Sequence, residues 1–215
     1  MNLFKRSILA LLFLILASFS VSLSIKAAIG VNASWDSLSQ NVFYLSGIKV
    51  GTFSMMLNLS CVLGQMIILN KNYHYSRLSQ ILVSLISGVF VNYFYYDVLS
   101  NIVIEHYMIR LALFVCAIVL MVFSVAVMMI VDVVTYPLES LVLVISQKTG
   151  WNFSILRQSV DVSSIGLSLL ITVLSTHILV VREGTVIGML LFGPLLGFFM
   201  NKIKPHFIRL QLTKV

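Results

Sequence analysis

The chain is short of charged residues, and this shortage excludes most classes of soluble protein. Only 10% of its 215 residues are charged, whereas 60% are hydrophobic and the mean hydropathy is +1.05. A typical soluble domain is roughly half apolar and about one quarter charged. Because so few polar residues cannot cover a water-soluble globule, the composition excludes an ordinary soluble enzyme, a disordered tail and a secreted disulfide scaffold. It favours a protein that crosses a membrane several times.

Cysteine is also scarce, and the motifs of enzymes and metal sites are missing. Cys61 and Cys116 lie in the middle of apolar runs, which is typical of small buried hydrophobic residues, and no cluster has the spacing of metal ligands. The sequence contains no P-loop, GxSxG, HExxH, CxxC or dinucleotide-binding fingerprint. We therefore expect no enzymatic activity, no cofactor and no bound metal.

The excess of basic residues indicates membrane topology rather than a nucleic-acid partner. The net charge is +7, but the basic residues stand at the ends of apolar runs, where the positive-inside rule places them. With the N-terminus inside, the cytoplasmic segments hold Lys5, Arg6, Lys71, Arg77, Lys148, Lys202, Lys204, Arg209 and Lys214. The external segments hold Lys26, Lys49, Arg110 and Arg182. This bias predicts a plasma-membrane protein with both termini in the cytoplasm.

Six uncharged apolar stretches are each close to the ~20 residues that a helix needs to cross a bilayer. Backbone groups in lipid must be paired within the segment, and the runs are continuous rather than alternating, so helices are favoured over a barrel. We predict an all-α polytopic membrane protein with a retained first helix. The six predicted transmembrane helices are Ser7–Ile25, Gly51–Asn70, Leu78–Tyr96, Leu111–Val131, Val162–Val181 and Gly184–Asn201.

Two shorter apolar pieces, Ser37–Ile48 and Ser140–Gln147, cannot cross the bilayer, and we predict that they are re-entrant or interfacial helices. Each follows an acidic residue, Asp36 or Glu139. An acid just before a helix can cap its first amide groups and interact favourably with its dipole. These two acids therefore have a structural explanation beside a functional one.

The two halves of the chain resemble each other. Residues 34–58 align without gaps with residues 137–161, at a shift of 103, and a block from Arg77 resembles one from Arg182, at a shift of 105. Matching blocks in the same order indicate duplication. With three spans in each half, the repeats would sit upside down relative to each other, as in many secondary transporters. The predicted units are residues 1–100 and 101–205, followed by a basic cytoplasmic tail, 206–215.

Motifs in both halves resemble those of the YczE-like bacterial integral membrane proteins, the YczE/YyaS/YitT group. The first half resembles an A-x-L-G-x-x-P-W-D segment and a G-x-x-x-G-T turn through Ala28, Gly30, Trp35, Asp36, Gly47, Gly51 and Thr52. Ser34 replaces the usual proline, and the usual G-T before the third span is missing. The second half matches through Pro137, Glu139, Leu141, Thr149, Gly150, Leu156, Arg157, Asp161, Gly184, Thr185, Gly193 and Pro194.

The resemblance covers the chain from about Ala27 to Phe199 and implies a multi-pass protein of the bacterial plasma membrane, without the soluble C-terminal domain of the YitT proteins. The family has no established general activity, so the resemblance implies fold and location rather than function. Within the matched motifs, we expect structural roles for Trp35, Gly47, Gly150, Gly184, Thr185, Gly193 and Pro194.

Arg157 and Asp161 are the most unusual charged residues, because they are spaced i,i+4 beside the fifth predicted span. An ionisable group inside a membrane costs about 3 kcal/mol or more and usually faces a bundle interior or a cavity. The pair is either part of a substrate or ion site or a structural ion pair near the interface, with the arginine reaching the headgroups. Polar side chains in spans also bond neighbouring helices. The candidate substrate-binding residues are Arg157, Asp161, Gln158, Asn58, Asp36 and Glu139.

These features favour a small-solute transporter or permease-like protein that resides in the lipid bilayer. The alternative is a non-transporting membrane scaffold or an accessory subunit of a membrane complex, including the substrate-binding subunit of a multi-component transporter. Either hypothesis leaves room for a homo-oligomer or a membrane partner protein. The sequence identifies neither the solute nor a coupling ion.

Overall fold

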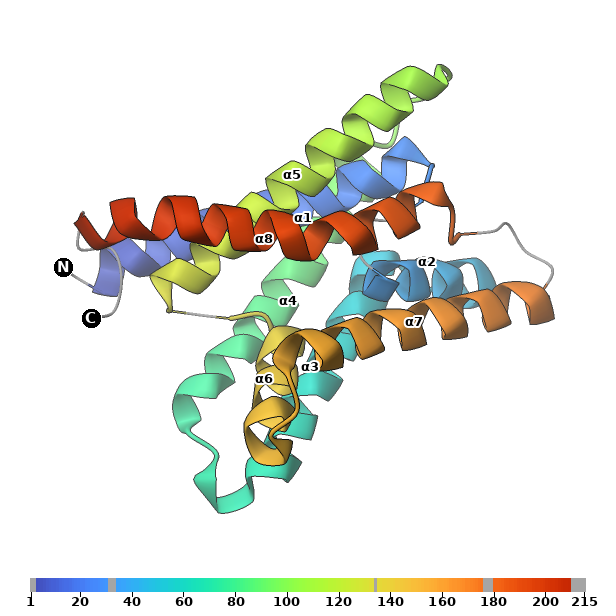
Figure 1. Ribbon diagram of the computed structural model, residues 1–215. Coiled ribbons are helices and arrows are strands. Elements are labelled where there is room, and N and C mark those ends of the chain that lie inside the picture. The colour runs from blue at the N-terminus through green and yellow to red at the C-terminus, as the bar shows by residue number, and fades with distance from the viewer. Residues whose placement is uncertain (1–2, 31–33, 134, 176–179, 210–215) are drawn as a thin grey trace.

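The described part of the chain folds entirely into helices and the loops between them. The computed structural model describes residues 3–30, 34–133, 135–175 and 180–209 (Figure 1). Its α-helices are α1 (Leu3–Ala27), α2 (Ser34–Ser46), α3 (Val50–Leu69), α4 (Ser79–Asn92), α5 (Tyr107–Val131), α6 (Pro137–Thr149), α7 (Phe153–Ser175) and α8 (Glu183–Arg209). Short 3₁₀ turns η1 (Asn70–Asn72) and η2 (Tyr75–Leu78) join α3 to α4, and a π-helical segment η3 (Tyr93–Val98) continues α4.

Six of these helices are long and apolar enough to cross a membrane, which confirms the predicted all-α fold with six spans. They comprise α1, α3 with η1, α4 with η3, α5, α7 and α8. The short helices α2 and α6 have 13 residues each. A helix of that length rises about 20 Å, at 1.5 Å per residue, and falls short of the ~30 Å hydrocarbon core.

Several helices begin earlier than the charge pattern predicts. The fifth span starts at Phe153 rather than Val162, so Arg157 and Asp161 lie within its first turns. The sequence argument ended each span at a charge, but an ion-paired arginine and aspartate can continue a helix. The short helices also begin three residues early, which places Asp36 and Glu139 inside the first turn rather than before it.

The C-terminal helix is longer than expected. The apolar pattern predicts that the last span ends at Asn201, whereas α8 continues to Arg209, into the segment 206–215 that was expected to be a tail. The remainder of that segment, residues 210–215, lies outside the described residues.

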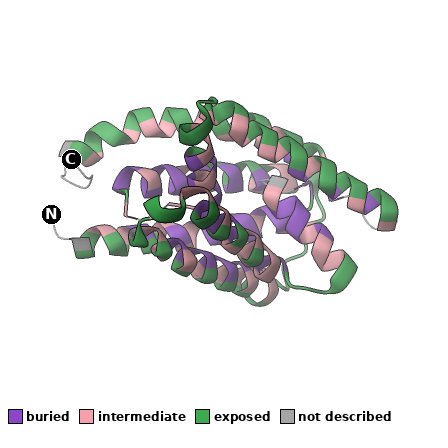
Figure 2. Ribbon diagram, turned by 90° about the horizontal axis from the view of Figure 1, so that it is seen from below, coloured by how far each residue is buried: buried purple, intermediate pink, exposed green. Residues whose placement is uncertain are grey.

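The helices α1 and α5 form the centre of the molecule and pack against each other in antiparallel directions (Figure 1). Ala10, near the start of α1, packs with Val127 and Val131 at the end of α5. Ile203 and Phe207, near the end of α8, join the same cluster. The start of α1 and the end of α8 therefore lie at one end of the bundle. Figure 2 shows that the buried residues concentrate in the middle of the helical array.

The helices of the second half follow those of the first in order, and the first two pairs match in length. The central helices α1 and α5 have 25 residues each and begin at Leu3 and Tyr107, a shift of 104. The short helices have 13 residues each and begin at a shift of 103. Both short helices end at a glycine with positive φ, Gly47 at +73° and Gly150 at +76°, a conformation that glycine adopts without strain.

Each short helix packs mainly against a spanning helix of the opposite half. The short helix α2 packs on α7, and α6 packs on α3. Asn41 of α2 donates a hydrogen bond to the Ser168 carbonyl of α7, at 3.0 Å, and Thr172 donates to the Asn41 side-chain oxygen, at 3.1 Å. This exchange brings the first turns of both short helices to the middle of the molecule.

The pair α3 and α4 packs much more closely than the corresponding pair α7 and α8. A Cβ atom added at Gly51 would lie 2.2 Å from the Gly88 carbonyl oxygen, and one at Gly88 would lie 2.6 Å from the Gly51 carbonyl oxygen. The two helices therefore cross with their backbones in contact, as small residues allow in membranes. In contrast, α7 and α8 diverge (Figure 1), and a Cβ at Gly193 or Gly197 would meet no atom of the described residues within 4 Å.

The Gly51–Gly88 crossing predicts a sharp difference between glycine substitutions. We expect Gly51→Ala and Gly88→Ala to lower the free energy of unfolding by roughly 1–3 kcal/mol, because the added methyl group meets backbone atoms. Gly193→Ala is the matched control and should change stability by less than about 0.5 kcal/mol. Unfolding of the purified variants in detergent measures the difference. Equal stability of all three variants would contradict the close crossing.

Candidate functional site

A small cavity lies at the centre of the bundle, where all eight α-helices meet. Its volume is about 70 Å³, which is room for a few water molecules or one small solute. Its lining residues are Ser18, Val21, Trp35, Asp36, Ser54, Asn58, Ser87, Val91, Met121, Val125, Tyr136, Leu138, Glu139, Arg157 and Phe192. The cavity thus combines charged and polar side chains from α2, α3, α6 and α7 with aromatic and aliphatic walls.

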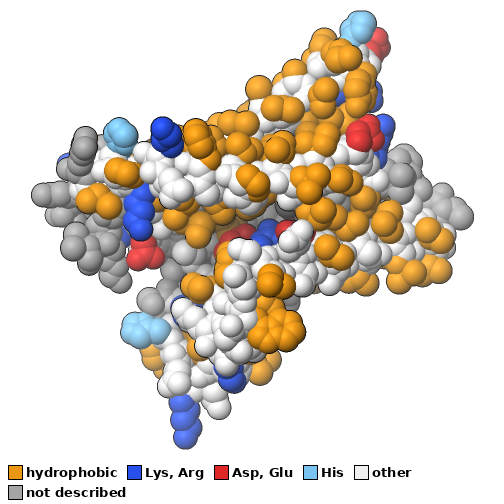
Figure 3. All heavy atoms as spheres, viewed as in Figure 1, with side chains coloured by type: hydrophobic (Ala, Val, Ile, Leu, Met, Phe, Trp, Pro, Cys, Tyr) orange, Lys and Arg blue, Asp and Glu red, His pale blue; other side chains and the backbone are white. Residues whose placement is uncertain are grey.

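Arg157 is the only basic residue among those that line the cavity, and it binds two carboxylates. Its Nε lies 3.5 Å from Glu139 Oε1, and its Nη1 lies 2.6 Å from Asp161 Oδ1. The side chains of this triad are only 15–18% exposed. The guanidinium carbon lies 5.9 Å from the ring centroid of Phe192, within the range of a cation–π interaction. Figure 3 shows acidic and basic side chains together in a hollow between α8 and α7.

Asp36 faces the same cavity from α2 but has no ion-pair partner at contact distance among the described residues. It is 7% exposed, and Ser54 donates a long hydrogen bond of 3.5 Å to its Oδ1. Burial raises the pKa of the Asp36 carboxyl from 3.8 to about 7. The Ser54 hydrogen bond and the Arg157 charge lower the pKa, whereas the Glu139 charge raises it. Burial thus favours the neutral form of this carboxyl over the charged one.

Two further polar groups at the cavity have no partner within the described structure. Asn58 is 8% exposed and lines the cavity, but its side chain makes no hydrogen bond to the described residues. The indole Nε1 of Trp35 is buried and also lacks an acceptor there. A buried polar group without a hydrogen bond is costly, so both groups present unsatisfied polar atoms at the cavity.

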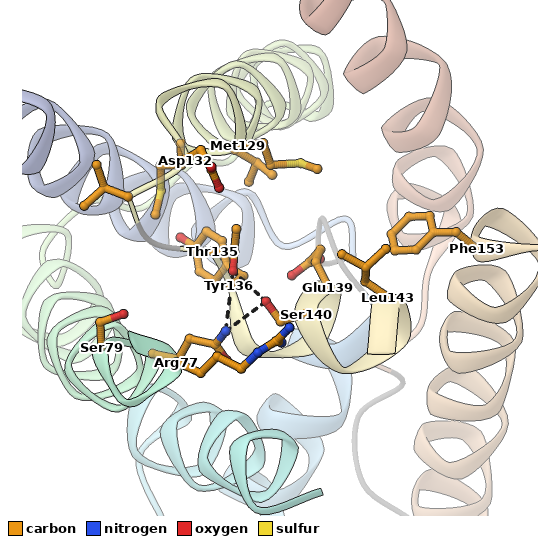
Figure 4. A pocket seen from close by; sticks show the side chains of 14 residues that line it. Arg77, Ser79, Met129, Asp132, Thr135, Tyr136, Glu139, Ser140, Leu143 and Phe153 are labelled. Atoms are coloured by element: carbon orange, nitrogen blue, oxygen red, sulfur yellow. Dashed lines mark hydrogen bonds between the residues drawn. The ribbon is translucent and has the colours of Figure 1, made fainter. Parts of the chain in front are cut away.

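A larger cavity, which we call the vestibule, lies beside the small one. Its volume is about 500 Å³, and its residues are Arg77, Ser79, Gln80, Val125, Met128, Met129, Asp132, Val133, Thr135, Tyr136, Glu139, Ser140, Leu143 and Phe153 (Figure 4). It shares Val125, Tyr136 and Glu139 with the small cavity. Glu139 therefore stands between the two cavities.

A hydrogen-bonded network forms one wall of the vestibule. Gln80 of α4 donates to Ser140 of α6 at 2.9 Å, and Figure 4 draws this bond. Gln65 of α3 donates to Gln80 at 2.8 Å and to the Pro137 carbonyl at 3.1 Å. Arg77 donates to Gln65 at 3.0 Å. These bonds tie α6 to α3 and α4 beside the vestibule.

At the opposite end of the bundle, which we call the closed end, the end of α1 and the start of α8 touch through backbone contacts. The Gly184 amide at the start of α8 donates to the Ile29 carbonyl at 2.8 Å, and Arg182 donates to the Ala28 carbonyl at 2.7 Å. A Cβ atom at Gly30 would lie 2.5 Å from the Thr185 nitrogen. This contact leaves no room for a side chain between the end of α1 and the start of α8.

The structure brings five of the six candidate site residues together. Asp36, Asn58, Glu139 and Arg157 line the small cavity, and Asp161 reaches it through its ion pair with Arg157. The sixth candidate, Gln158, is exposed on α7 and does not line the cavity. Its position next to Arg157 in the sequence places it about 100° around the helix, on another face.

The expected motif residues have distinct places in the fold. Trp35 lines the cavity, Gly47 and Gly150 end the short helices, and Gly184 and Thr185 form the closed end. Gly193 and Pro194 lie within α8.

The sequence argument missed Ser54, Tyr136 and Phe192, which line the cavity. For Ser54, the alignment of the two halves was a usable signal, since Ser54 corresponds to Arg157 at the shift of 103. The other two reach the cavity through tertiary packing alone.

Comparisons with known proteins agree with a YczE-like membrane protein. The model of a family of unknown function, DUF6198, matches residues 4–201. The uncharacterized membrane protein YczE of Bacillus subtilis is 25% identical over 151 residues, which are 70% of this chain and 67% of that protein. No solved structure is significantly similar to the chain. The resemblance inferred from the motifs is therefore confirmed.

The buried Arg157 triad predicts a large effect of removing the guanidinium. We expect Arg157→Gln to lower the free energy of unfolding by about 3 kcal/mol, because Glu139 and Asp161 would keep their charges without a partner. Combining it with Asp161→Asn should recover part of the loss. The exposed Arg182–Glu183 pair is the control, and Glu183→Gln should cost less than about 1 kcal/mol. If Arg157→Gln and Glu183→Gln lower the free energy of unfolding in detergent by the same amount, the triad does not stabilise the bundle.

Proposed function

The chain belongs to the DUF6198 family, and we propose that it is a multi-pass transporter or permease for a small solute, with the central cavity as its substrate site. The observation that carries this proposal is the meeting of Asp36, Glu139 and Arg157 at a cavity to which every α-helix contributes. Ionisable side chains inside a membrane are expensive to keep and usually mark a substrate or ion pathway. A scaffold that only packs its helices needs no such cavity.

We also propose that the two halves form an inverted repeat around the cavity, which would support the transport hypothesis. The corresponding helices α1 and α5 pack antiparallel, as expected if one half is turned over relative to the other. At the shift of 103, Asp36 corresponds to Glu139 and Ser54 to Arg157, and all four line the cavity. Substrate sites of inverted-repeat transporters lie at this kind of interface, where short or broken helices of the two halves meet.

The two ends of the bundle also differ as an alternating-access mechanism requires. The vestibule reaches Glu139 from one end, whereas the end of α1 and the start of α8 are in close contact at Gly30 and Thr185 at the other. Such an arrangement exposes a central site to one side of the membrane at a time.

We propose that the vestibule faces the cytoplasm of a bacterial cell. Lys5 and Arg6 at the start of α1, Lys71 and Arg77 between α3 and α4, and the basic end of α8 share the vestibule's side of the bundle. The positive-inside rule places such residues in the cytoplasm. Both termini would then be cytoplasmic, as the sequence predicts.

Cysteine labelling tests this proposal without knowledge of the solute. In a variant with Cys61→Ala and Cys116→Ala, Thr135→Cys places a thiol in the vestibule and Thr185→Cys places one at the closed end. In sealed vesicles, a charged maleimide should label the Thr135→Cys protein rapidly from the vestibule side. It should label the Thr185→Cys protein slowly from the opposite side, because that end opens only in the second state.

The labelling also distinguishes the alternative function. A scaffold or accessory subunit needs only one state, so its closed end would remain unlabelled in the folded protein while the vestibule reacts. That result would contradict the transport proposal. A cysteine-free variant controls for labelling of other groups, and thermal unfolding confirms that each variant is folded.

A further inference from the structure

The two halves place matching groups of three residues at the cavity, but with different charges. In the second half, Arg157 of α7 binds Glu139 of α6 and Asp161 one turn further along α7. The corresponding residues of the first half, at the shift of 103, are Ser54, Asp36 and Asn58. Ser54 contacts Asp36 as Arg157 contacts Glu139, so the contact between the spanning helix and the acid of the short helix recurs in both halves. The first half therefore has the corresponding acid, Asp36, on its short helix, but its spanning helix α3 has Ser54 in place of an arginine.

The missing guanidinium leaves groups without partners at the cavity. Asp36 has only the long hydrogen bond from Ser54, and Asn58 has none from the described residues. Both side chains are more than nine-tenths buried and line the cavity of about 70 Å³. An oxygen of Asp36 and the carbonyl oxygen of Asn58 are the acceptors that an N–H donor with positive charge would bind.

The charge balance of the site also favours a cation. Among the described residues at the site, three carboxylates, Asp36, Glu139 and Asp161, lie near one guanidinium, which pairs with the last two. An uncompensated negative charge in a bundle within a membrane is unfavourable. The first turns of α2 and α6 already carry their own acids, Asp36 and Glu139. These carboxylates compensate the positive N-terminal ends of the two helix dipoles, so the helix ends do not favour a bound anion.

The walls of the cavity distinguish an organic cation from a metal ion. Trp35, Tyr136 and Phe192 contribute aromatic surface, and the aliphatic part of the wall comes from Val21, Val91, Met121, Val125 and Leu138. Aromatic faces attract organic cations, whereas hard metal ions require a shell of oxygen ligands. The protein already holds one organic cation against an aromatic ring at this cavity, because the Arg157 guanidinium lies beside Phe192.

We propose that a small organic monocation of the guanidinium or ammonium class binds between Asp36, Ser54 and Asn58, in the position that corresponds to the Arg157 guanidinium of the other half. This inference rests on the proposed function, since it takes the central cavity as the transport site and names its substrate class. A cation bound there would form an ion pair with Asp36, for which the described residues supply no basic partner at contact distance.

Binding of such a cation competes with a proton on Asp36. The groups that face Asp36 are Ser54 of α3, Glu139 of α6, Arg157 of α7 and Tyr136 before α6. Burial raises the pKa of Asp36 to about 7, so the carboxyl is largely protonated below neutral pH. The affinity for the cation should therefore rise as the pH increases through about 7, with release of a proton.

The test measures binding by the purified protein in detergent, with guanidinium and methylammonium chloride at low millimolar concentration as probes. We expect a saturable rise in the unfolding temperature and a calorimetric signal for these cations. Urea, a neutral molecule of the same shape as guanidinium, and sodium chloride should give neither. Asp36→Asn should weaken cation binding about tenfold or more, which corresponds to a lost charge-assisted hydrogen bond.

Two further variants probe the position of the site. Ser54→Arg should abolish binding, because its tethered guanidinium takes the place of the solute, and Asn58→Asp should strengthen binding by adding a second carboxylate. Asp97→Asn, which removes an exposed acid far along the chain in η3, is the matched control and should bind as the unmodified protein does. Each variant is first shown to unfold cooperatively without a probe.

Three results would overturn the inference. They are equal effects of sodium and the organic cations, binding of urea or an anion in their place, and cation binding that Asp36→Asn leaves unchanged. The absence of any binding would also overturn it. None of these results decides the transport proposal, which depends on labelling at Thr185. Conversely, cation binding with a permanently closed Thr185 end would support the site and contradict transport.

Discussion

The ion pairs of Arg157 with Glu139 and Asp161 are the interaction on which the centre of the molecule depends. One guanidinium joins α6 to α7 and neutralises two carboxylates that would otherwise be isolated among apolar helices. Without it, the first turn of α6 could not keep an ionised acid at the middle of the bundle, because the cost of an unpaired charge there is several kcal/mol. The same guanidinium also forms part of the cavity wall beside Phe192.

The exchange of short helices between the halves explains how these charges reach one place. Because α2 packs on α7 and α6 packs on α3, neither half can form its part of the cavity alone. The hydrogen bonds of Asn41 with Ser168 and of Gln65 with the Pro137 carbonyl fix the two exchanged contacts. The cavity is thus a property of the assembled pair, which is where transporters with internal repeats place their sites.

The sequence predicted most of the fold, because in a membrane the length of an apolar run nearly determines the element. It failed at the start of the fifth span, where Arg157 and Asp161 lie inside α7. The i,i+4 spacing shows that Arg157 and Asp161 can pair, but the second partner of Arg157, Glu139, belongs to another helix, and no local pattern reveals that contact. Gln158 was included among the site residues for its place beside Arg157, although the helix turns it outward.

The cavity itself was only partly predictable. The charged candidates were found because ionisable residues are conspicuous in apolar sequence, whereas Tyr136 and Phe192 are ordinary residues for a membrane protein. Ser54 becomes a candidate site residue only when the two halves are aligned, because it then corresponds to Arg157. Small residues were informative where backbones touch, as at Gly184, but the same type of residue at Gly193 faces open space.

The two ends of the bundle carry different residues at corresponding positions, and this difference constrains the proposed transport cycle. At the closed end, Gly30 and Gly184 let the end of α1 touch the backbone at the start of α8. The residues that correspond to these glycines at the open end are Val133 and Ser79, at shifts of 103 and 105, and both line the vestibule. Both carry a side chain where the other end has a glycine, and Gln80, next to Ser79, bridges to Ser140 by a hydrogen bond. In the proposed transport cycle, the vestibule end therefore cannot close by the backbone contact seen at the other end, and the two closed states must be built from different interactions.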